Sequence, residues 1–337
     1  MKLWFERGAW ASKQGRKKVA ALSREKVASI AVIRHAALGD MVLLRPFLYE
    51  LRRFFPNARI TLSLVSNYIY GAPEELVDRV HIIHGSDQRN VSRITQIKKI
   101  KELGYHDIIF DMASTSRSHL VVLLNRAGIK VGFPYRGALR RILYDVAVLR
   151  SDFRFEAESM MDMLHVFGCD SRYPLQFDLD IKPASVQKPY IVYFPSASTK
   201  DKCWPHALFS TLIKQMANEY GEYQHIILEG IADWESIEEI IEPLSQFENV
   251  EGNKAVSLDT TLSLIKHAKL LVSNDTGIRN LAIAAGTSTL GIFFKTIPYR
   301  YWPRGIIHEA AFEADGSIPD VTKVKLKISK MLEKLGE

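Results

Sequence analysis

The chain alternates between short apolar runs and longer segments in which apolar residues recur with helical spacing. In the first half, the apolar runs are rich in Ile and Val and cover residues 29–34, 58–65, 80–84 and 106–112. Segments with helical spacing lie between them, for example residues 41–55 and 91–104. Strands that alternate with helices in this way predict βαβ units built around a parallel sheet.

The same pattern begins again in the second half of the chain. Apolar runs predict strands over residues 189–195, 224–230, 269–274 and 288–294. Helical spacing predicts helices over residues 205–221, 234–244, 261–269 and 278–286. The second half is therefore predicted to be another α/β domain of the same kind.

A stretch that breaks this alternation, residues 170–189, contains prolines and predicts a linker between the halves. The 337 residues suit two domains, at roughly 100–200 residues per domain. We predict two doubly wound, Rossmann-like domains that face each other across a cleft. The predicted segments are a basic N-terminal extension (1–27), a first domain (28–180), a second domain (181–319) and an amphipathic C-terminal helix (320–337).

Composition excludes several classes of protein. No apolar stretch approaches the ~18–20 residues that a membrane-spanning helix needs, and the N-terminus lacks the apolar run of a signal peptide. Two cysteines, Cys169 and Cys203, are too few for a disulfide framework or a zinc site. We therefore expect a cytoplasmic protein.

Positive charge is concentrated in the first half. Residues 1–180 hold 28 Lys and Arg against 19 Asp and Glu, whereas the whole chain has a net charge of +7. This asymmetry favours an anionic partner, which is a nucleic acid, a phospholipid surface or a phosphorylated substrate. A basic surface that serves only solubility is the alternative. In the N-terminal extension, Trp4, Phe5 and Trp10 lie near lysines and predict an interfacial membrane anchor, with a disordered basic tail as the alternative.

A small polar loop, Ser273 to Gly277, separates the predicted strand 269–274 from the apolar helix that follows. Asp275 or Thr276 is suited to cap this helix, whose N-terminus carries free N–H groups and a partial positive charge. Gly277 allows a ligand to approach the backbone closely. The loop therefore predicts a phosphate site, and an ordinary capped turn is the alternative.

Two further loops occupy equivalent places. In residues 34–40, Asp40 stands at the start of a helix, where it serves either as a general base for a hydroxyl or as a plain cap. This loop is not a G-x-G-x-x-G fingerprint, so a dinucleotide-binding site is not predicted. Residues 195–205 contain hydroxyls and cations suited to a diphosphate: Ser196, Ser198, Thr199, Lys200 and Lys202.

Together these loops resemble the three conserved motifs of the lipopolysaccharide heptosyltransferases, glycosyltransferase family 9. The matching stretches are "IRHAALGDMVLLRPFLYELRRFFPNARI", "SASTKDKCWP" and "LLVSNDTGIRNLAIAAGTSTLGIFF". The resemblance spans residues 28–300 and implies the two-domain GT-B fold. It implies inverting, metal-independent transfer of a sugar from a nucleotide diphosphate sugar, typically ADP-heptose, to a lipid-linked core oligosaccharide, with no cofactor. It also implies that the C-terminal helix packs on the first domain.

The resemblance assigns roles to individual residues. Asp40 matches the proposed catalytic base, and Lys202 matches the lysine that contacts the donor diphosphate. The donor-binding candidates are Ser196, Ser198, Thr199, Lys202, Glu235, Asp275, Thr276, Gly277 and Asn280. Asn280 stands where family members commonly carry histidine, so the preferred donor is left open.

The basic first half fits an anionic, lipid-linked acceptor, with Arg117 and Arg136 as the acceptor-binding candidates. We expect a monomer, peripheral on the cytoplasmic face of the inner membrane, that binds no nucleic acid and no metal. The "DLD" at residues 178–180 resembles a metal motif of other glycosyltransferases but lies in the predicted linker. The alternatives are a glycosyltransferase with another nucleotide sugar, a nucleotide-sugar epimerase of related fold, and a basic nucleic-acid-binding protein.

Overall fold

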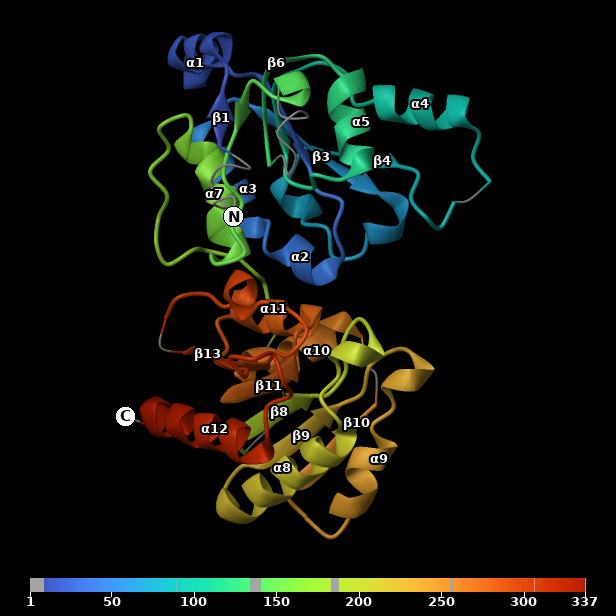
Figure 1. The fold of residues 1–337 in the computed structure, drawn as a ribbon, viewed down its shortest axis with the longest axis vertical. Coiled ribbons are helices and arrows are strands. Elements are labelled where there is room, and N and C mark those ends of the chain that lie inside the picture. Colours follow the sequence, from blue (N-terminus) through green and yellow to red (C-terminus); the bar gives the residue numbers. More distant parts are fainter. Residues whose placement is uncertain are drawn as a thin grey trace. The chain divides into compact units, whose positions relative to one another are not determined.

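The computed structural model divides the chain into two compact units, unit 1 (Met1–Asp178) and unit 2 (Leu179–Glu337). Each unit contains one β-sheet with helices packed against it (Figure 1). The unit boundary falls two residues before the predicted one. The residues that the structure describes are 9–88, 90–133, 141–182, 188–254, 257–305 and 307–336.

The sheet of unit 1 has seven strands in the order β1-β7-β6-β5-β2-β3-β4. All neighbours are parallel except β1 and β7. The strands are β1 (Trp10–Ala11), β2 (Ser29–Ile33), β3 (Arg59–Val65), β4 (Arg79–Ile83), β5 (His106–Asp111), β6 (Ala127–Gly132) and β7 (Val146–Ala147). Since β2 pairs with β3 on one side and β5 on the other, the strand order reverses at β2. Open α/β sheets bind ligands at such a switch point, beyond the carboxyl ends of the strands.

The sheet of unit 2 is fully parallel, with the order β10-β9-β8-β11-β12-β13. Its strands are β8 (Tyr190–Phe194), β9 (Gln224–Leu228), β10 (Val250–Asn253), β11 (Leu270–Asn274), β12 (Thr289–Ile292) and β13 (His308–Ala311). This is the 3-2-1-4-5-6 order of a doubly wound Rossmann sheet, and its switch point lies between β8 and β11. The predicted α/β class with two Rossmann-like units is confirmed.

The helices of unit 1 differ from the prediction at one place. They are α1 (Lys13–Ala20), α2 (Leu38–Val42), α3 (Arg45–Phe54), α4 (Arg93–Lys101), α5 (Ser116–Leu124) and α7 (Glu156–His165). The single helix predicted over 41–55 is divided into α2 and α3. Pro46 explains the break, because proline has no N–H with which to continue the helical hydrogen bonding.

The helices of unit 2 are α8 (His206–Glu219), α9 (Glu238–Ile241), α10 (Leu258–His267), α11 (Gly277–Ala285) and α12 (Val321–Gly336). The C-terminal helix, expected to pack on the first domain, buries its apolar residues in unit 2. Val324, Ile328 and Met331 of α12 are buried in the same cluster as Tyr193 and Phe209 of unit 2. The apolar stripe of the helix therefore completes the core of its own unit.

The N-terminal extension is tied to the sheet of unit 1 over its described part. Trp10 and Ala11 pair with Ala147 and Val146, and Lys18 forms an ion pair of 2.9 Å with Asp145. Residues 9–27 are therefore not a free tail. Of the three aromatic residues on which the predicted membrane anchor rests, Trp10 lies in β1, and Trp4 and Phe5 lie outside the described residues. Among the described helices, none is both long enough and apolar enough to span a bilayer.

Candidate functional site

Two loops leave the switch-point edge of the unit 2 sheet together. One follows β8 and the other joins β11 to α11, and these strands are parallel neighbours with Ser273 opposite Phe194. Asn274, fully buried at the end of β11, connects the loops. Its Oδ1 accepts a hydrogen bond from the Trp204 N–H at 3.0 Å, and its Nδ2 donates to the carbonyl of Pro195. Asn274, a polar residue at the end of the apolar run, thus connects the two loops through hydrogen bonds.

The structure brings the predicted Lys202 and Asp275 into contact. The Lys202 Nζ lies 3.2 Å from Asp275 Oδ2, and the lysine side chain is the more exposed of the two. Thr276 is the N-cap residue of α11, but no side-chain capping hydrogen bond is formed. Of the two residues predicted to cap the helix, Thr276 occupies the N-cap position, whereas Asp275 pairs with Lys202. The N-terminus of α11 keeps its partial positive charge without a side-chain cap.

The remaining donor candidates are distributed around these loops. Ser196 is buried, and its hydroxyl lies 3.4 Å from the backbone carbonyl of Glu235. The Glu235 carboxylate accepts from the Ala232 N–H at 2.9 Å and so stabilises its own turn. Ser198 and Thr199 are exposed in the loop, whereas Asn280 is buried on α11.

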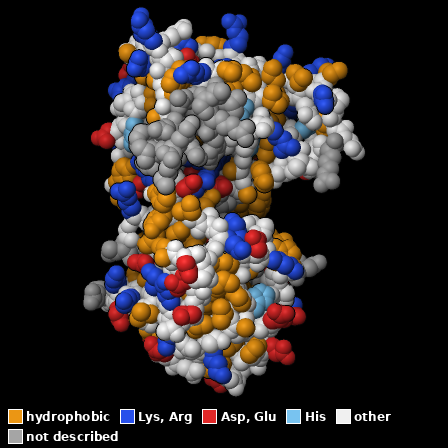
Figure 2. All heavy atoms as spheres, in the orientation of Figure 1, with side chains coloured by type: hydrophobic (Ala, Val, Ile, Leu, Met, Phe, Trp, Pro, Cys, Tyr) orange, Lys and Arg blue, Asp and Glu red, His pale blue; other side chains and the backbone are white. Residues whose placement is uncertain are grey.

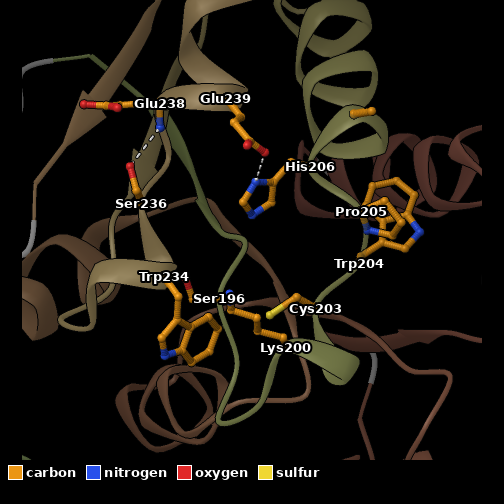
Figure 3. A pocket seen from close by; sticks show the side chains of 11 residues that line it. Ser196, Lys200, Cys203, Trp204, Pro205, His206, Trp234, Ser236, Glu238 and Glu239 are labelled. Carbon is orange, nitrogen blue, oxygen red and sulfur yellow. Dashed lines mark hydrogen bonds and ion pairs between the residues drawn. The ribbon is translucent and has the colours of Figure 1, made fainter.

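A pocket of about 620 Å³ lies beside these loops, between the loop after β8, the start of α8 and the turn after β9 (Figure 3). In Figure 3, Lys200 lies beside Trp234, with its Nζ 6.0 Å from the ring centroid. The figure also shows the His206–Glu239 pair, which is separated by 3.1 Å. Of the residues predicted to suit the donor or its diphosphate, Ser196 and Lys200 line this pocket. The pocket is lined by Ser196, Lys200, Cys203, Trp204, Pro205, His206, Ala207, Trp234, Ser236, Glu238 and Glu239.

Sequence reasoning missed Trp234, His206 and Glu239 as site residues. The available signal was position, since Trp234 follows the end of β9 and His206 begins α8 after the diphosphate loop. Aromatic and charged residues at such positions are also common in ordinary turns, so position alone did not distinguish them.

In unit 1, Asp40 lies in the first turn of α2, at the switch-point end of β2, as predicted. Its side chain is 35% exposed, so the carboxylate is accessible. Arg34 holds this loop. Its guanidinium donates to the Asp40 carbonyl at 3.2 Å and to the Met112 carbonyl at 2.9 Å, and lies 4.0 Å from the Asp40 carboxylate.

A buried carboxylate fixes Arg34 in turn. Glu156, at the start of α7, is fully buried and lies 3.2 Å from Arg34. The same carboxylate pairs with Arg150, whose side chain is mostly buried. A buried carboxylate is stable only when it is paired, so this network holds the loop of residues 34–40 in one geometry. Glu156 was not predicted, since Arg34, the partner that links it to Asp40, is 122 positions away along the chain.

His35, the residue after Arg34, is not suited to be a base. Burial, with a smaller contribution from the positive charge of Arg117, lowers the pKa of His35 to about 3. Both ring nitrogens are buried without a hydrogen-bond partner. The imidazole is therefore neutral at physiological pH.

The predicted acceptor residue Arg117 is exposed at the start of α5. Its helix begins at a turn organised by Asp111, which is fully buried at the end of β5. Asp111 accepts hydrogen bonds from the Tyr144 hydroxyl at 2.6 Å and the Ser118 hydroxyl at 3.0 Å. Arg136, the other acceptor candidate, lies outside the described residues.

Within the described part of the chain, no three His, Cys, Asp or Glu side chains converge as a metal site would require. Cys169 and Cys203 are both free thiols. Burial raises the pKa of each thiol, which makes them weaker nucleophiles at neutral pH.

Comparison with known proteins identifies the family of the chain and proteins of the same fold. The family model described as glycosyltransferase family 9 (heptosyltransferase) matches residues 94–323. Lipopolysaccharide heptosyltransferase 3 of Escherichia coli is 22% identical over 293 residues, which cover 80% of this chain and 85% of that protein.

Two solved structures share the fold. The E. coli heptosyltransferase WaaC with ADP-2-deoxy-2-fluoro heptose has a TM-score of 0.71 at 17% identity, covering 92% of this chain and 100% of that one. The E. coli ADP-heptose lps heptosyltransferase II has a TM-score of 0.69 at 20% identity, with the same coverage. The predicted GT-B fold is confirmed.

Proposed function

Since the chain belongs to glycosyltransferase family 9 and is a glycosyltransferase, we propose that it transfers heptose from ADP-heptose to a lipid-linked core oligosaccharide of lipopolysaccharide. The observation that carries this proposal is the Lys202–Asp275 pair beside the N-terminus of α11. A cation and free backbone N–H groups at a switch point suit the diphosphate of a nucleotide sugar. The names of the similar proteins, which are heptosyltransferases, support heptose as the sugar.

In this proposal, unit 2 binds the donor. Lys202, the hydroxyls of Ser198 and Thr199, and the N–H groups around Thr276 and Gly277 contact the diphosphate. Ser196 and Glu235 lie beside the pocket, which offers the Trp234 ring and polar groups to the rest of the nucleotide. When the sugar leaves, negative charge develops on the diphosphate, and these fixed groups stabilise it.

Asp40 acts as the general base. It accepts the proton of the acceptor hydroxyl as that oxygen attacks the anomeric carbon from the face opposite the diphosphate. The new C–O bond forms while the bond to the diphosphate breaks, which inverts the anomeric configuration and releases ADP. The Arg34 contacts keep the carboxylate in place for this transfer.

We propose that the reaction is metal-independent, because Lys202 and α11 supply the positive charge that a metal would provide. Activity is then expected to persist in excess chelator. A loss of activity that added Mg²⁺ restores would contradict this part of the proposal.

The acceptor is proposed to be anionic, with Arg117 and Arg136 binding its phosphates or carboxylates. On the face drawn in Figure 2, Lys and Arg side chains project at many points of unit 1 among hydrophobic ones. This distribution favours weak, peripheral association of a monomer with the anionic cytoplasmic surface of the inner membrane. Since Asn280 stands where family members commonly carry histidine, a different nucleotide sugar is the alternative donor.

The test is release of free nucleotide from a panel of ADP- and UDP-linked sugars, with and without lipid-linked core acceptor. We expect release from ADP-heptose that depends on the acceptor. Lys202→Met should lower kcat/KM about a hundredfold, whereas Lys214→Met, on the exposed side of α8, should not. If only a different nucleotide sugar is turned over, the proposed reaction class stands and the proposed donor is wrong. No turnover with any donor would contradict the proposal.

A further inference from the structure

Arg279 occupies a position that is unfavourable for a cation in three ways. It lies in the first turn of α11, where the helix dipole is already positive. Its side chain is 1% exposed, so its charge is removed from water. No acidic residue lies in the same helical turn. Such a residue is expected only where something else requires its charge.

The contacts of the guanidinium are with neutral groups. It donates to the backbone carbonyls of Tyr301 and Glu309 and lies over the ring of Phe293, 5.3 Å from its centroid. Its Nε has no hydrogen-bond partner. Gly291 of strand β12 leaves room for the Arg279 side chain, because a Cβ at position 291 would lie 2.5 Å from the Arg279 Nε.

The nearby acids are paired with other cations. Asp275 pairs with Lys202, and the Glu309 carboxylate lies 3.0 Å from Lys327. Within the described ranges, no carboxylate forms an ion pair with Arg279. Lys202, Asp275 and Arg279 together therefore carry a net charge of about +1 beside the donor loop.

The charge of Arg279 persists at physiological pH. Burial lowers its pKa to about 10, which is still well above neutrality. The neighbouring His308 is affected by this field, since burial and then Arg279 lower the pKa of its imidazole to about 3. The negative charge of Asp275 opposes this decrease of the Arg279 pKa. A positive charge in a low-dielectric interior acts over a longer range than one in water.

We propose that Arg279 is a positioning residue whose buried charge is balanced by the diphosphate of the bound donor. This inference rests on the proposed donor site in unit 2 and adds a group that does not touch the donor. Its guanidinium connects the first turn of α11 to the segment around Tyr301 and Glu309 through hydrogen bonds. Its positive charge offsets the negative charge of Asp275. The diphosphate therefore meets a net positive loop even though a carboxylate lies within it.

The test compares ligands that differ in phosphate charge, namely ADP, AMP, adenosine and inorganic pyrophosphate, by calorimetric titration of the full-length protein. Arg279→Met removes the charge, Arg279→Gln removes it but keeps a hydrogen-bond donor, and Arg279→Lys keeps it. Arg304→Met is the matched control, because Arg304 is exposed in the same unit. Thermal unfolding of each variant shows whether it folds. If Arg279→Met does not fold, Arg279→Gln is used as the neutral variant.

We expect the neutral variants to bind ADP and pyrophosphate about tenfold more weakly, with adenosine affinity unchanged. Arg279→Lys should recover most of the loss, and Arg304→Met should show none. If Arg279 has a purely structural role, the neutral variants should bind adenosine and ADP more weakly by the same factor. That result would overturn the inference and leave the proposed function standing. Unchanged ADP binding in the neutral variants would do the same. If the wild type binds pyrophosphate in an Arg279-dependent way but not ADP, the proposed donor fails and the inference stands. If it binds neither, both are overturned.

Discussion

At the scale of single residues, the site consists of ionised groups held by partners that the sequence does not reveal. Asp40 and Lys202 could be predicted because each follows a recognisable strand. The groups that hold them could not, because Glu156 is 122 positions from Arg34, which contacts Asp40, and Asp275 is 73 positions from Lys202 along the chain. Only the fold brings such residues together, and burial then determines whether a charge needs a partner.

The Arg34–Glu156–Arg150 network provides a prediction at this scale. Glu156→Gln leaves two buried guanidinium groups without their carboxylate, so the free energy of unfolding should fall by about 3 kcal/mol. Activity should fall as well, because Arg34 no longer fixes Asp40. Urea denaturation and initial rates measure these effects. Glu25→Gln, in an exposed pair with Arg24, should leave the denaturation midpoint unchanged, and an equal shift in both variants would contradict the account.

At the scale of elements, the apolar runs predicted most strands to within two residues. The missed strands are short or lie toward sheet edges, and they carry few apolar residues; they are β1, β6, β7, β10 and β13. The N-cap of α11 was predicted to be Asp275 or Thr276, and it is Thr276. The ion pair between Asp275 and Lys202 could not be predicted, because an aspartate at this place is suited equally to a cap and to an ion pair. The pocket beside Trp234 was missed because its residues come from two stretches that are distant in sequence, 196–207 and 234–239.

The C-terminal helix gives the second prediction. Ile328 of α12 is fully buried in the core of unit 2, so Ile328→Ala should lower the free energy of unfolding by about 2–5 kcal/mol. Leu326, two residues earlier in the same helix, is 53% exposed. Leu326→Ala should therefore change stability little when both are followed by chemical denaturation. A larger effect at Leu326 than at Ile328 would show that α12 packs by its other face.

At the scale of the whole molecule, each unit has a doubly wound sheet with candidate site residues at its switch point. Unit 1 presents Asp40 there and unit 2 presents Lys202 and Asp275. The sequence predicted this arrangement because buried parallel strands are apolar throughout and polar residues must appear where the strands end. The placement of α12 was not predictable from its amphipathic pattern, because that pattern fits any apolar surface.

Buried histidines in both units make stability depend on pH. Burial lowers the pKa of His35 and His308 to about 3 and that of His225 to about 4. In the unfolded chain each titrates near ~6.5, so the unfolded state binds more protons as the pH falls below that value. Stability is thus fully present above pH ~6.5 and decreases by about 1.4 kcal/mol per histidine for each pH unit below it.

Denaturation at pH 7 and pH 5 tests this dependence. The wild type should be less stable at the lower pH, and His35→Leu should show a smaller difference, because it removes one proton-binding group and two unpaired buried nitrogens. A pH dependence identical in wild type and His35→Leu would contradict the assignment of His35 as a buried neutral imidazole.

The most direct test of the central claim compares wild type with Asp40→Asn in a single assay. ADP release and the mass and anomeric configuration of the product are followed with ADP-heptose, in the presence and absence of lipid-linked core acceptor. Asp170→Asn, an exposed acid of the same unit, is the control. We predict acceptor-dependent release with inversion in the wild type and control, and a rate at least about a hundredfold lower in Asp40→Asn with donor affinity unchanged. Full activity of a folded Asp40→Asn variant, or retention of configuration in the product, would contradict the account.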